Sequence, residues 1–183
     1  MGLRGLINRC RKDDGSAAVE FGLVAIPFIY MTIAIFELCI FFASANTLEF
    51  ALNSSARMIR TGQLQASGVT DMEAAFKNDL CSRLLGLLDC AQVGLESVTV
   101  PDGDFTSAEN YGAELNPDGT LKSRGFDPGV SDSVVLVRVF YRYHMMTPLF
   151  AKLFSTQPDD SIILLSTVVL ENEPYTFDPS GGS

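Results

Sequence analysis

The chain has 183 residues, of which 47% are hydrophobic, and a formal net charge of −9 at pH 7. This acidic balance argues against nucleic-acid binding, because proteins that bind the phosphate backbone present clustered cations. After the long apolar segment near the N-terminus, about 140 residues remain, which is enough for one domain but short for two.

The apolar segment runs from Phe21 to Ala43, and Glu37 is its only acidic or basic residue. As a helix it is about 34 Å long, enough to cross a hydrocarbon core about 30 Å thick. Four cations precede it, whereas the first cation after it is Arg57; the four are Arg4, Arg9, Arg11 and Lys12. The positive-inside rule therefore predicts one transmembrane helix with a cytoplasmic N-terminus and an exported C-terminal domain.

Three other interpretations of this segment compete with a retained transmembrane helix. A secretory signal peptide cleaved near Ala43-Ser44-Ala45 is possible in composition, but the apolar run exceeds the usual length of about 7 to 15 residues. A lipoprotein site at Cys39 is rejected, because the preceding Leu38 is bulky where a small residue is needed. A buried helix of a soluble protein fits neither the length nor the preceding cations.

A short motif precedes the span: Gly15 ends a charged leader, four small or apolar residues follow, and Glu20-Phe21 comes next. This order resembles the type IVb (Flp-type) prepilin processing pattern, in which a membrane-embedded prepilin peptidase cuts after the glycine on the cytoplasmic side. The resemblance implies cleavage between Gly15 and Ser16. Small residues allow an extended backbone to enter a protease, and we expect Asp13 and Asp14 to prevent the helix from beginning earlier.

Cleavage makes Glu20 the fifth residue of the mature chain, where it is able to meet the new amino terminus of a neighbouring subunit. Such a pair is stronger in a poorly hydrated environment than in water, provided that both partners are present. The alternative is an interfacial carboxylate stabilised by the dipole at a helix N-terminus.

Glu37 lies about 26 Å along the helix from Glu20, deep in the span. An isolated carboxylate there costs several kcal/mol, so we expect it to be protonated, paired or turned into a helix bundle. We favour a contact with another transmembrane helix over a neutral acid hydrogen-bonded within its own helix. Pro27, about one turn into the span, predicts a kink or a locally melted turn.

The helix is expected to continue to Gly62, which suits the C′ position, with Arg57 and Arg60 in the last turn. Apolar or small side chains recur at helical spacing over this part: Leu48, Leu52, Ser55 or Ala56, and Ile59. The predicted division is a leader over 1–15, the long helix over 16–62, a head over 63–175 and a disordered tail over 176–183.

A second helix is predicted from a capping box, in which Thr70 and Glu73 satisfy exposed amides reciprocally. Its apolar face comprises Met72, Phe76, Leu80 and Leu84. Cys81 and Cys90 flank its far end and form a disulfide if the chain turns back near Gly86; otherwise they are two separately buried thiols.

The pattern then changes to period two and predicts an α+β head with a small antiparallel sheet. Strands are expected over Leu95–Val100, Ser133–His144 and Ser161–Leu170, with a helical turn over Leu149–Phe154. In the central strand the valines and tyrosines from Val135 to Tyr143 share one face, and Arg138 and Arg142 lie on the other. Residues 105–132 are expected to form a long loop, with a hairpin around 116–119.

Taken together, the order of these motifs resembles the TadE-like family, which comprises pseudopilins (minor pilins) of the tight-adherence (Flp, type IVb) pilus system. The motifs are the processing pattern, the span with Pro27 and Glu37, Ala56–Gln63, the cysteine pair, the Val-rich strand, Thr-Pro-Leu at 147–149 and Asn-Glu-Pro-Tyr at 172–175. No resemblance is claimed for residues 105–132.

The resemblance implies a single-pass protein of the bacterial inner membrane with a periplasmic head, and an association with the pilus. The implied partners are a prepilin peptidase, other pseudopilins, the major Flp pilin, the inner-membrane assembly platform and the lipid bilayer. Loss of residues 1–15 removes four cations and two acids, leaving 9 against 20 and a net charge of −11. Such an acidic head is not expected to bind nucleic acid.

Catalysis is not expected, because the sequence has no Gly-rich phosphate loop, no Gly-x-Ser-x-Gly motif and only one histidine, His144. No cofactor and no metal are predicted. The competing hypothesis is an uncleaved, membrane-anchored periplasmic domain that binds a ligand or acts as a sensor.

Overall fold

The computed structural model describes residues 14–116, 120–155, 157 and 159–175. The chain divides into two compact units, Met1–Ile40 and Phe41–Ser183. The predicted tail over 176–183 and all of the predicted leader except residues 14 and 15 lie outside the described residues.

The long helix α2 runs without interruption from Asp14 to Arg60 and contributes to both units. Its residues up to Ile40 are the described part of the first unit. Its residues from Phe41 onward belong to the second unit, where they pack in the core of the head.

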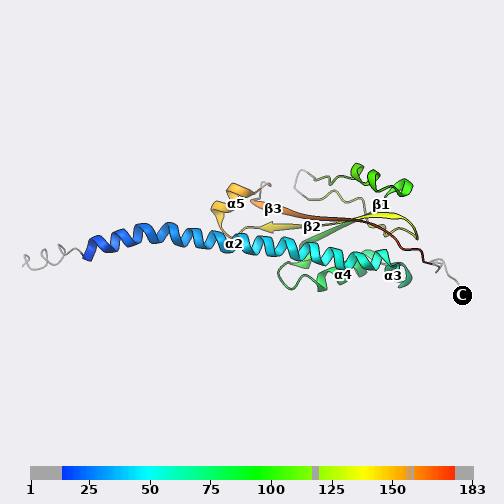
Figure 1. The fold of residues 1–183 in the computed structure, drawn as a ribbon, viewed down its shortest axis with the longest axis horizontal. Helices are drawn as coiled ribbons and strands as arrows, with labels where there is room; N and C mark the ends of the chain where they lie inside the picture. The colour runs from blue at the N-terminus through cyan, green and yellow to red at the C-terminus, as the bar shows by residue number, and fades with distance from the viewer. Residues whose placement is uncertain (1–13, 117–119, 156, 158, 176–183) are drawn as a thin grey trace, which may run out of the picture. The chain divides into compact units, whose positions relative to one another are not determined.

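The head contains further helices and one sheet, which confirms the predicted α+β class (Figure 1). The α-helices are α3 (Gln63–Ala66), α4 (Met72–Ser82) and α5 (Pro148–Phe154). The 3₁₀ helices are η1 (Cys90–Gln92), η2 (Pro101–Gly103) and η3 (Phe105–Asn110). The strands are β1 (Val93–Thr99), β2 (Val134–His144) and β3 (Ser161–Glu171).

The three strands form one antiparallel sheet in the order β1-β2-β3. Arg138 of the central strand β2 lies opposite Glu96 of β1 on one side and Thr167 of β3 on the other. β-branched and aromatic residues dominate β2, and their alternation places one set on each face of the sheet.

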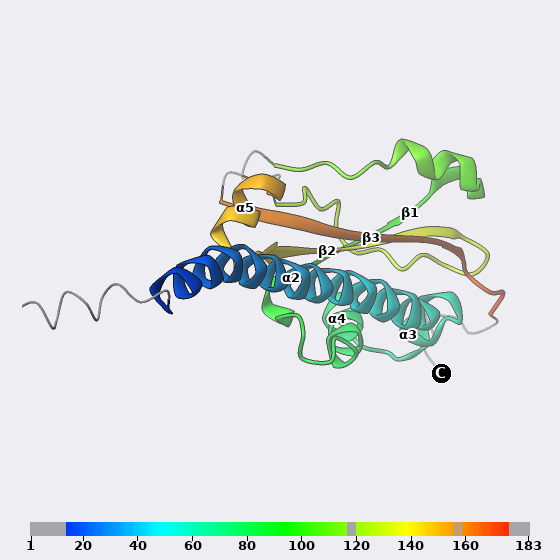
Figure 2. The same ribbon diagram turned by 60° about the vertical axis from the view of Figure 1, so that its left-hand side comes forward.

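One face of the sheet is covered by the second half of α2 and by α4, which lie on the same side of it in both views (Figures 1 and 2). The buried side chains of this core include Leu48, Leu52, Ile59, Phe76, Leu80, Leu84, Val135, Val137, Val139 and Tyr141. The predicted stripe of α2 and the predicted apolar face of β2 are therefore confirmed. Because each element contributes one apolar face, none of them could bury it alone.

The opposite face of the sheet carries a smaller apolar cluster of Val100, Val134 and Leu136, against which Ala108, Tyr111 and Val169 pack. Residues 105–132 thus form more than the expected loop. They contain η3 and a parallel bridge between Ser97 and Phe126, whose ring packs 5.4 Å from that of Phe76. A bridge between Leu115 and Leu121 flanks the predicted hairpin, whose residues 117–119 lie outside the described part.

Two helix ends test the predicted caps. At the end of α2, Gly62 has φ 69° and its amide donates to Ile59 O at 3.0 Å, which confirms the predicted C′ glycine. The start of α4 differs, because the N-cap is Asp71 rather than Thr70, and its carboxylate accepts from the Ala74 amide at 2.9 Å. A carboxylate is favoured over a hydroxyl here because the helix dipole adds to the hydrogen bond.

Candidate functional site

The predicted processing motif lies in the first turns of α2. Gly15 and Ser16 are helical, and one turn brings the Ser16 hydroxyl to Glu20, where Oγ donates to Oε1 at 3.1 Å. The described part of α2 begins at Asp14, and Asp13 lies outside the described residues, so the expectation that the two aspartates prevent an earlier start stays a prediction. The Gly15–Ser16 bond lies in the first turn of the described part of α2.

Beyond the motif, α2 presents large apolar side chains to its surroundings on every side. Those exposed include Val19, Phe21, Leu23, Val24, Ile26, Phe28, Ile29, Met31, Ile33, Ile35 and Phe36. Phe21 is 75% exposed and Leu23 is 72% exposed. Such a helix is not stable in water by itself, because its apolar surface is too large and has no polar side. By length and composition it could cross a membrane.

Glu37 and Ala34 depart from this pattern, since they are 3% and 8% exposed. The Glu37 carboxyl group is therefore not part of the exposed apolar surface of α2. Its contact with another transmembrane helix stays a prediction. Helix α2 continues through Pro27, so of the two alternatives predicted there the locally melted turn is absent, and the kink stays a prediction.

The cysteines of the head, Cys81 and Cys90, form the predicted disulfide, with their Cα atoms 5.6 Å apart. The chain turns back between them, and Gly86 at φ 72° provides the left-handed residue that this turn requires. Among the described residues, Cys39 is a free and exposed cysteine. No group of three or more His, Cys, Asp or Glu side chains in the described part is placed to hold a metal ion.

A polar contact joins α2 to α4 beside the core. The Ser55 hydroxyl donates to Asp79 Oδ2 at 2.8 Å, and Arg83 donates to both carboxylate oxygens of Asp79 at 3.0 Å. The Arg83 hydrogen bonds, assisted by that from Ser55, hold the pKa of Asp79 below its usual value despite partial burial. The same contact raises the pKa of Arg83.

Sequence reasoning missed a buried ion pair in the sheet. Glu96 is 0% exposed, and one of its carboxylate oxygens accepts from Arg138, itself buried. Its other oxygen accepts from both the backbone amide and the guanidinium of Arg124, at 3.0 and 3.1 Å. Arg138 also donates to Tyr111 O, so the pair fastens the 105–132 segment to the sheet. Arg138 lies on the face of β2 opposite the tyrosines, as predicted. The sequence did offer one indication of the ion pair, because Glu96 and Arg138 are opposite charges inside two predicted strands.

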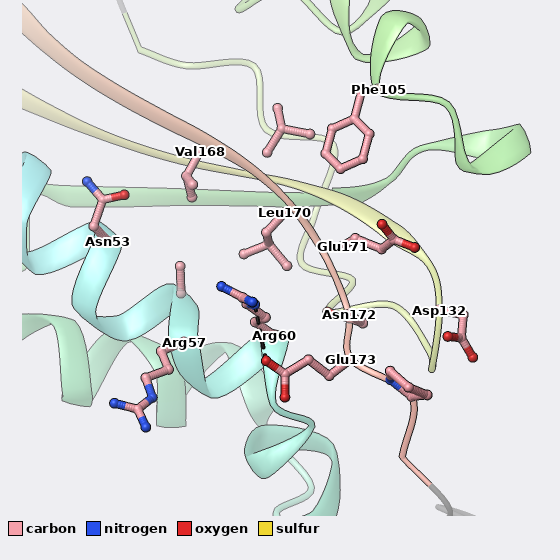
Figure 3. A pocket seen from close by; sticks show the side chains of 13 residues that line it. Asn53, Arg57, Arg60, Phe105, Asp132, Val168, Leu170, Glu171, Asn172 and Glu173 are labelled. Atoms are coloured by element: carbon pink, nitrogen blue, oxygen red, sulfur yellow. Dashed lines mark ion pairs between the residues drawn. The ribbon is translucent and has the colours of Figure 1, made fainter.

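A groove of about 670 Å³ lies beside the end of β3 and the last turns of α2 (Figure 3). At one end Arg60 and Glu173 join its two walls, with Nε 3.3 Å from Oε1 and the Glu173 amide donating to Arg60 O at 2.8 Å. The walls also carry the carboxylates of Asp132 and Glu171. Nothing in the periodicity of the sequence pointed to this groove, because it is formed by segments about a hundred residues apart.

These observations define a class: an α+β protein whose N-terminal helix is long and apolar enough to span a membrane once. Within that class, residues 15–57 match the family model described as TadE-like protein. The resemblance predicted from the sequence is thereby confirmed over this segment, consistent with a TadE-like protein of the tight-adherence pilus system. No curated protein matches the chain, and no solved structure matches it.

Proposed function

We propose that this chain is a pseudopilin-like assembly protein of the tight-adherence (Flp, type IVb) pilus. In this proposal prepilin peptidase cleaves it after Gly15, and its N-terminal helix then packs with other pilin-like subunits. The observation that carries the proposal is the exposed apolar surface on all sides of α2 directly after the Gly15–Phe21 motif. That surface requires lipid or other apolar helices around it. The TadE-like match covers the same segment.

Cleavage would create an ammonium group on Ser16, one helical turn from Glu20. The Glu20 side chain is exposed and accepts only the Ser16 hydroxyl among its recorded contacts in the described residues. It is therefore accessible to the amino terminus of a neighbouring subunit. In a poorly hydrated filament interior, that pair would set the axial position of one helix against the next.

The proposed location is the bacterial inner membrane, with the leader in the cytoplasm and the head in the periplasm. The uneven cations around the span support this orientation. The proposed partners are the peptidase, other pseudopilins, the major Flp pilin and the assembly platform.

The cleavage proposal is tested by N-terminal sequencing of the chain from its host, with two matched variants. A Cβ atom at Gly15 or Gly22 meets nothing within 4 Å, so the two positions are matched in the space next to the backbone. We expect the wild type and Gly22→Leu to begin at Ser16. Gly15→Leu is expected to retain its leader and to abolish piliation. A wild-type chain that begins at Met1 would favour the anchored ligand-binding or sensor domain, and one that begins at Asn46 would indicate a signal peptide.

The proposed role of Glu37 predicts that Glu37→Ala weakens co-purification with a partner pseudopilin while membrane insertion is unchanged. Phe36→Ala, on the exposed side of the same turn, is the matched control for loss of apolar surface. Equal co-purification of wild type and Glu37→Ala would remove the interhelical role.

A further inference from the structure

The two edges of the sheet are treated differently by the rest of the head. The outer edge of β1 is covered, because the Ser97 amide donates to Gly125 O at 3.0 Å and the Asp127 amide donates to Ser97 O at 2.9 Å. Across the described residues, no backbone hydrogen bond is recorded to the outer edge of β3 between Ser161 and Glu171. An uncovered edge offers a row of unpaired amides and carbonyls to another strand.

The register identifies which groups of β3 face outward. The Val100 amide bonds to Val134 O, so the even residues of β2 bond to β1 and the odd residues bond to β3. The Asn172 amide bonds to Ser133 O, in agreement with this assignment. In antiparallel pairs the amide and carbonyl of one residue point the same way. The outward residues of β3 are therefore Ser161, Ile163, Leu165, Thr167, Val169 and Glu171.

This edge is long and apolar, unlike the edges that soluble proteins protect. Residues 162–170 contain no charged residue and no proline. Leu165 is 47% exposed, and β3 is more exposed along its length than β2. Natural edge strands usually carry a charge, a proline or a bulge that prevents pairing with another chain. Their absence here indicates that the edge is kept available.

The groove lies beside the C-terminal half of this edge. Val168 and Leu170 line it on the side of α2, together with Ala56 (Figure 3). Phe105 and Val169 line it on the opposite side of β3. An extended segment paired with the outward groups of Thr167, Val169 and Glu171 would lie in this groove, with alternate side chains directed toward the two walls.

We propose that the outer edge of β3 binds an extended apolar segment of a partner protein, with Lys or Arg at its ends, as a fourth strand of the sheet. Both ends of β3 are acidic, with Asp159 and Asp160 before it and Glu171 and Glu173 after it. Asp159 and Glu173 already pair with Arg142 and Arg60, whereas Glu171 has no recorded partner in the described part. This site concerns the head, goes beyond the proposed packing of the helix, and does not depend on cleavage after Gly15.

The same charges argue against a second copy of this chain as the occupant. Antiparallel pairing of two β3 strands would place Asp159 and Asp160 of one copy beside Glu171 and Glu173 of the other. Parallel pairing would place each acidic end beside its equivalent. Like charges directly opposite one another on neighbouring strands are unfavourable. A partner segment with a cation at each end would instead place opposite charges beside the acidic residues at the two ends of β3, which is favourable.

The test uses the full chain in nanodiscs and a synthetic peptide of four Thr-Val repeats with Lys at each end. A peptide with Glu at each end is the charge control. Amide hydrogen exchange is measured residue by residue. We expect the Lys-ended peptide to slow exchange of the outward amides of Leu165, Thr167 and Val169 by at least about tenfold. The inward amides already bond to β2 and are expected to change much less.

Three variants separate strand addition from general binding. Glu171→Lys is expected to lower the affinity for the Lys-ended peptide about fivefold and to raise the affinity for the Glu-ended peptide about fivefold. A misfolded protein cannot reverse the preference in this way. Leu165→Pro removes an outward amide without removing a bond to β2, so it should abolish binding while Leu165→Ala retains it.

Three results would overturn the proposal. The first is binding of the Lys-ended peptide without protection of the outward amides, which indicates another site. The second is protection of these amides by dimerisation in the absence of peptide, which makes a second copy the occupant. The third is absence of binding by both peptides to a wild-type chain whose inward amides of β3 are protected as in a folded sheet.

Discussion

The two halves of α2 share one backbone conformation but face different surroundings. Up to Ile40 the helix exposes large apolar side chains, with Leu23 72% exposed, and Glu37 is a buried exception. From Phe41 onward one stripe is buried in the core, and Leu52 in that stripe is 0% exposed, whereas Phe42 and Phe50 lie outside it and are exposed. Helical structure alone therefore does not distinguish a segment that needs an apolar environment from one that creates a core. The distribution of apolar residues around the helix does.

The head buries the apolar faces of its elements against one another, whereas the first half of α2 leaves its apolar surface exposed. In the head, α2, α4 and the sheet each bury one face in a common core. Substitutions in the head should therefore change its own stability, and substitutions in the first half of α2 should change association. Three measurements test this comparison.

The largest effect on stability is expected from Glu96→Gln. This change leaves Arg138, whose side chain is 5% exposed, without its buried carboxylate. Breaking a buried ion pair by removing one partner costs about 3–5 kcal/mol of unfolding free energy. Urea unfolding followed by tyrosine fluorescence measures the loss. Glu114→Gln, at an exposed carboxylate that pairs with Lys122 and with the outer side of Arg124, is the control and should cost far less.

The double variant Glu96→Leu/Arg138→Met removes both charges and should recover most of the lost stability. If Glu96→Gln and Glu114→Gln lowered the unfolding free energy by the same small amount, the ion pair of Glu96 and Arg138 would not stabilise the attachment of the 105–132 segment to the sheet.

The next largest effect compares one leucine in each half of α2. Leu52→Ala removes a fully buried side chain and should lower the unfolding free energy of the head by about 2–5 kcal/mol. Leu23→Ala removes an exposed side chain and should leave that energy unchanged. Both are measured by urea unfolding in the same detergent. Equal losses would mean that the two halves do not differ in the way described.

The smallest effect concerns the pH dependence of the contact between Ser55, Asp79 and Arg83. The pKa of Asp79 is lowered in the folded protein, chiefly by Arg83, from an unfolded value near 3.8. Its stabilisation is therefore complete above the unfolded pKa and is lost as the pH falls through the folded pKa. Asp79→Asn should cost about 1–2 kcal/mol at pH 7, and this difference should shrink below about pH 4. A difference that stays constant from pH 7 to pH 3 would contradict the assignment.

Much of the fold could be predicted because it depends on local patterns. The helical spacing of apolar residues from Leu48 to Ile59 predicts the buried face of α2, and the alternation of apolar and polar residues predicts the buried face of β2. The ends of the strands agree with the structure within two residues, since glycine, proline and acidic turns bound them. Local capping was less certain, because Thr70 and Asp71 are both able to cap a helix and only the observed backbone distinguishes them.

The sequence by itself determined the apolar span and the α+β class and favoured the disulfide between Cys81 and Cys90 that the structure contains, because each depends on spacing within a short segment or on turn chemistry. Only the tertiary structure decided that Glu96 meets Arg138 and Arg124, that residues 105–132 cover one sheet edge, and that β3 is left open beside a groove. These features join residues far apart in the chain, and the packing of the strands and of α2 in three dimensions brings them together.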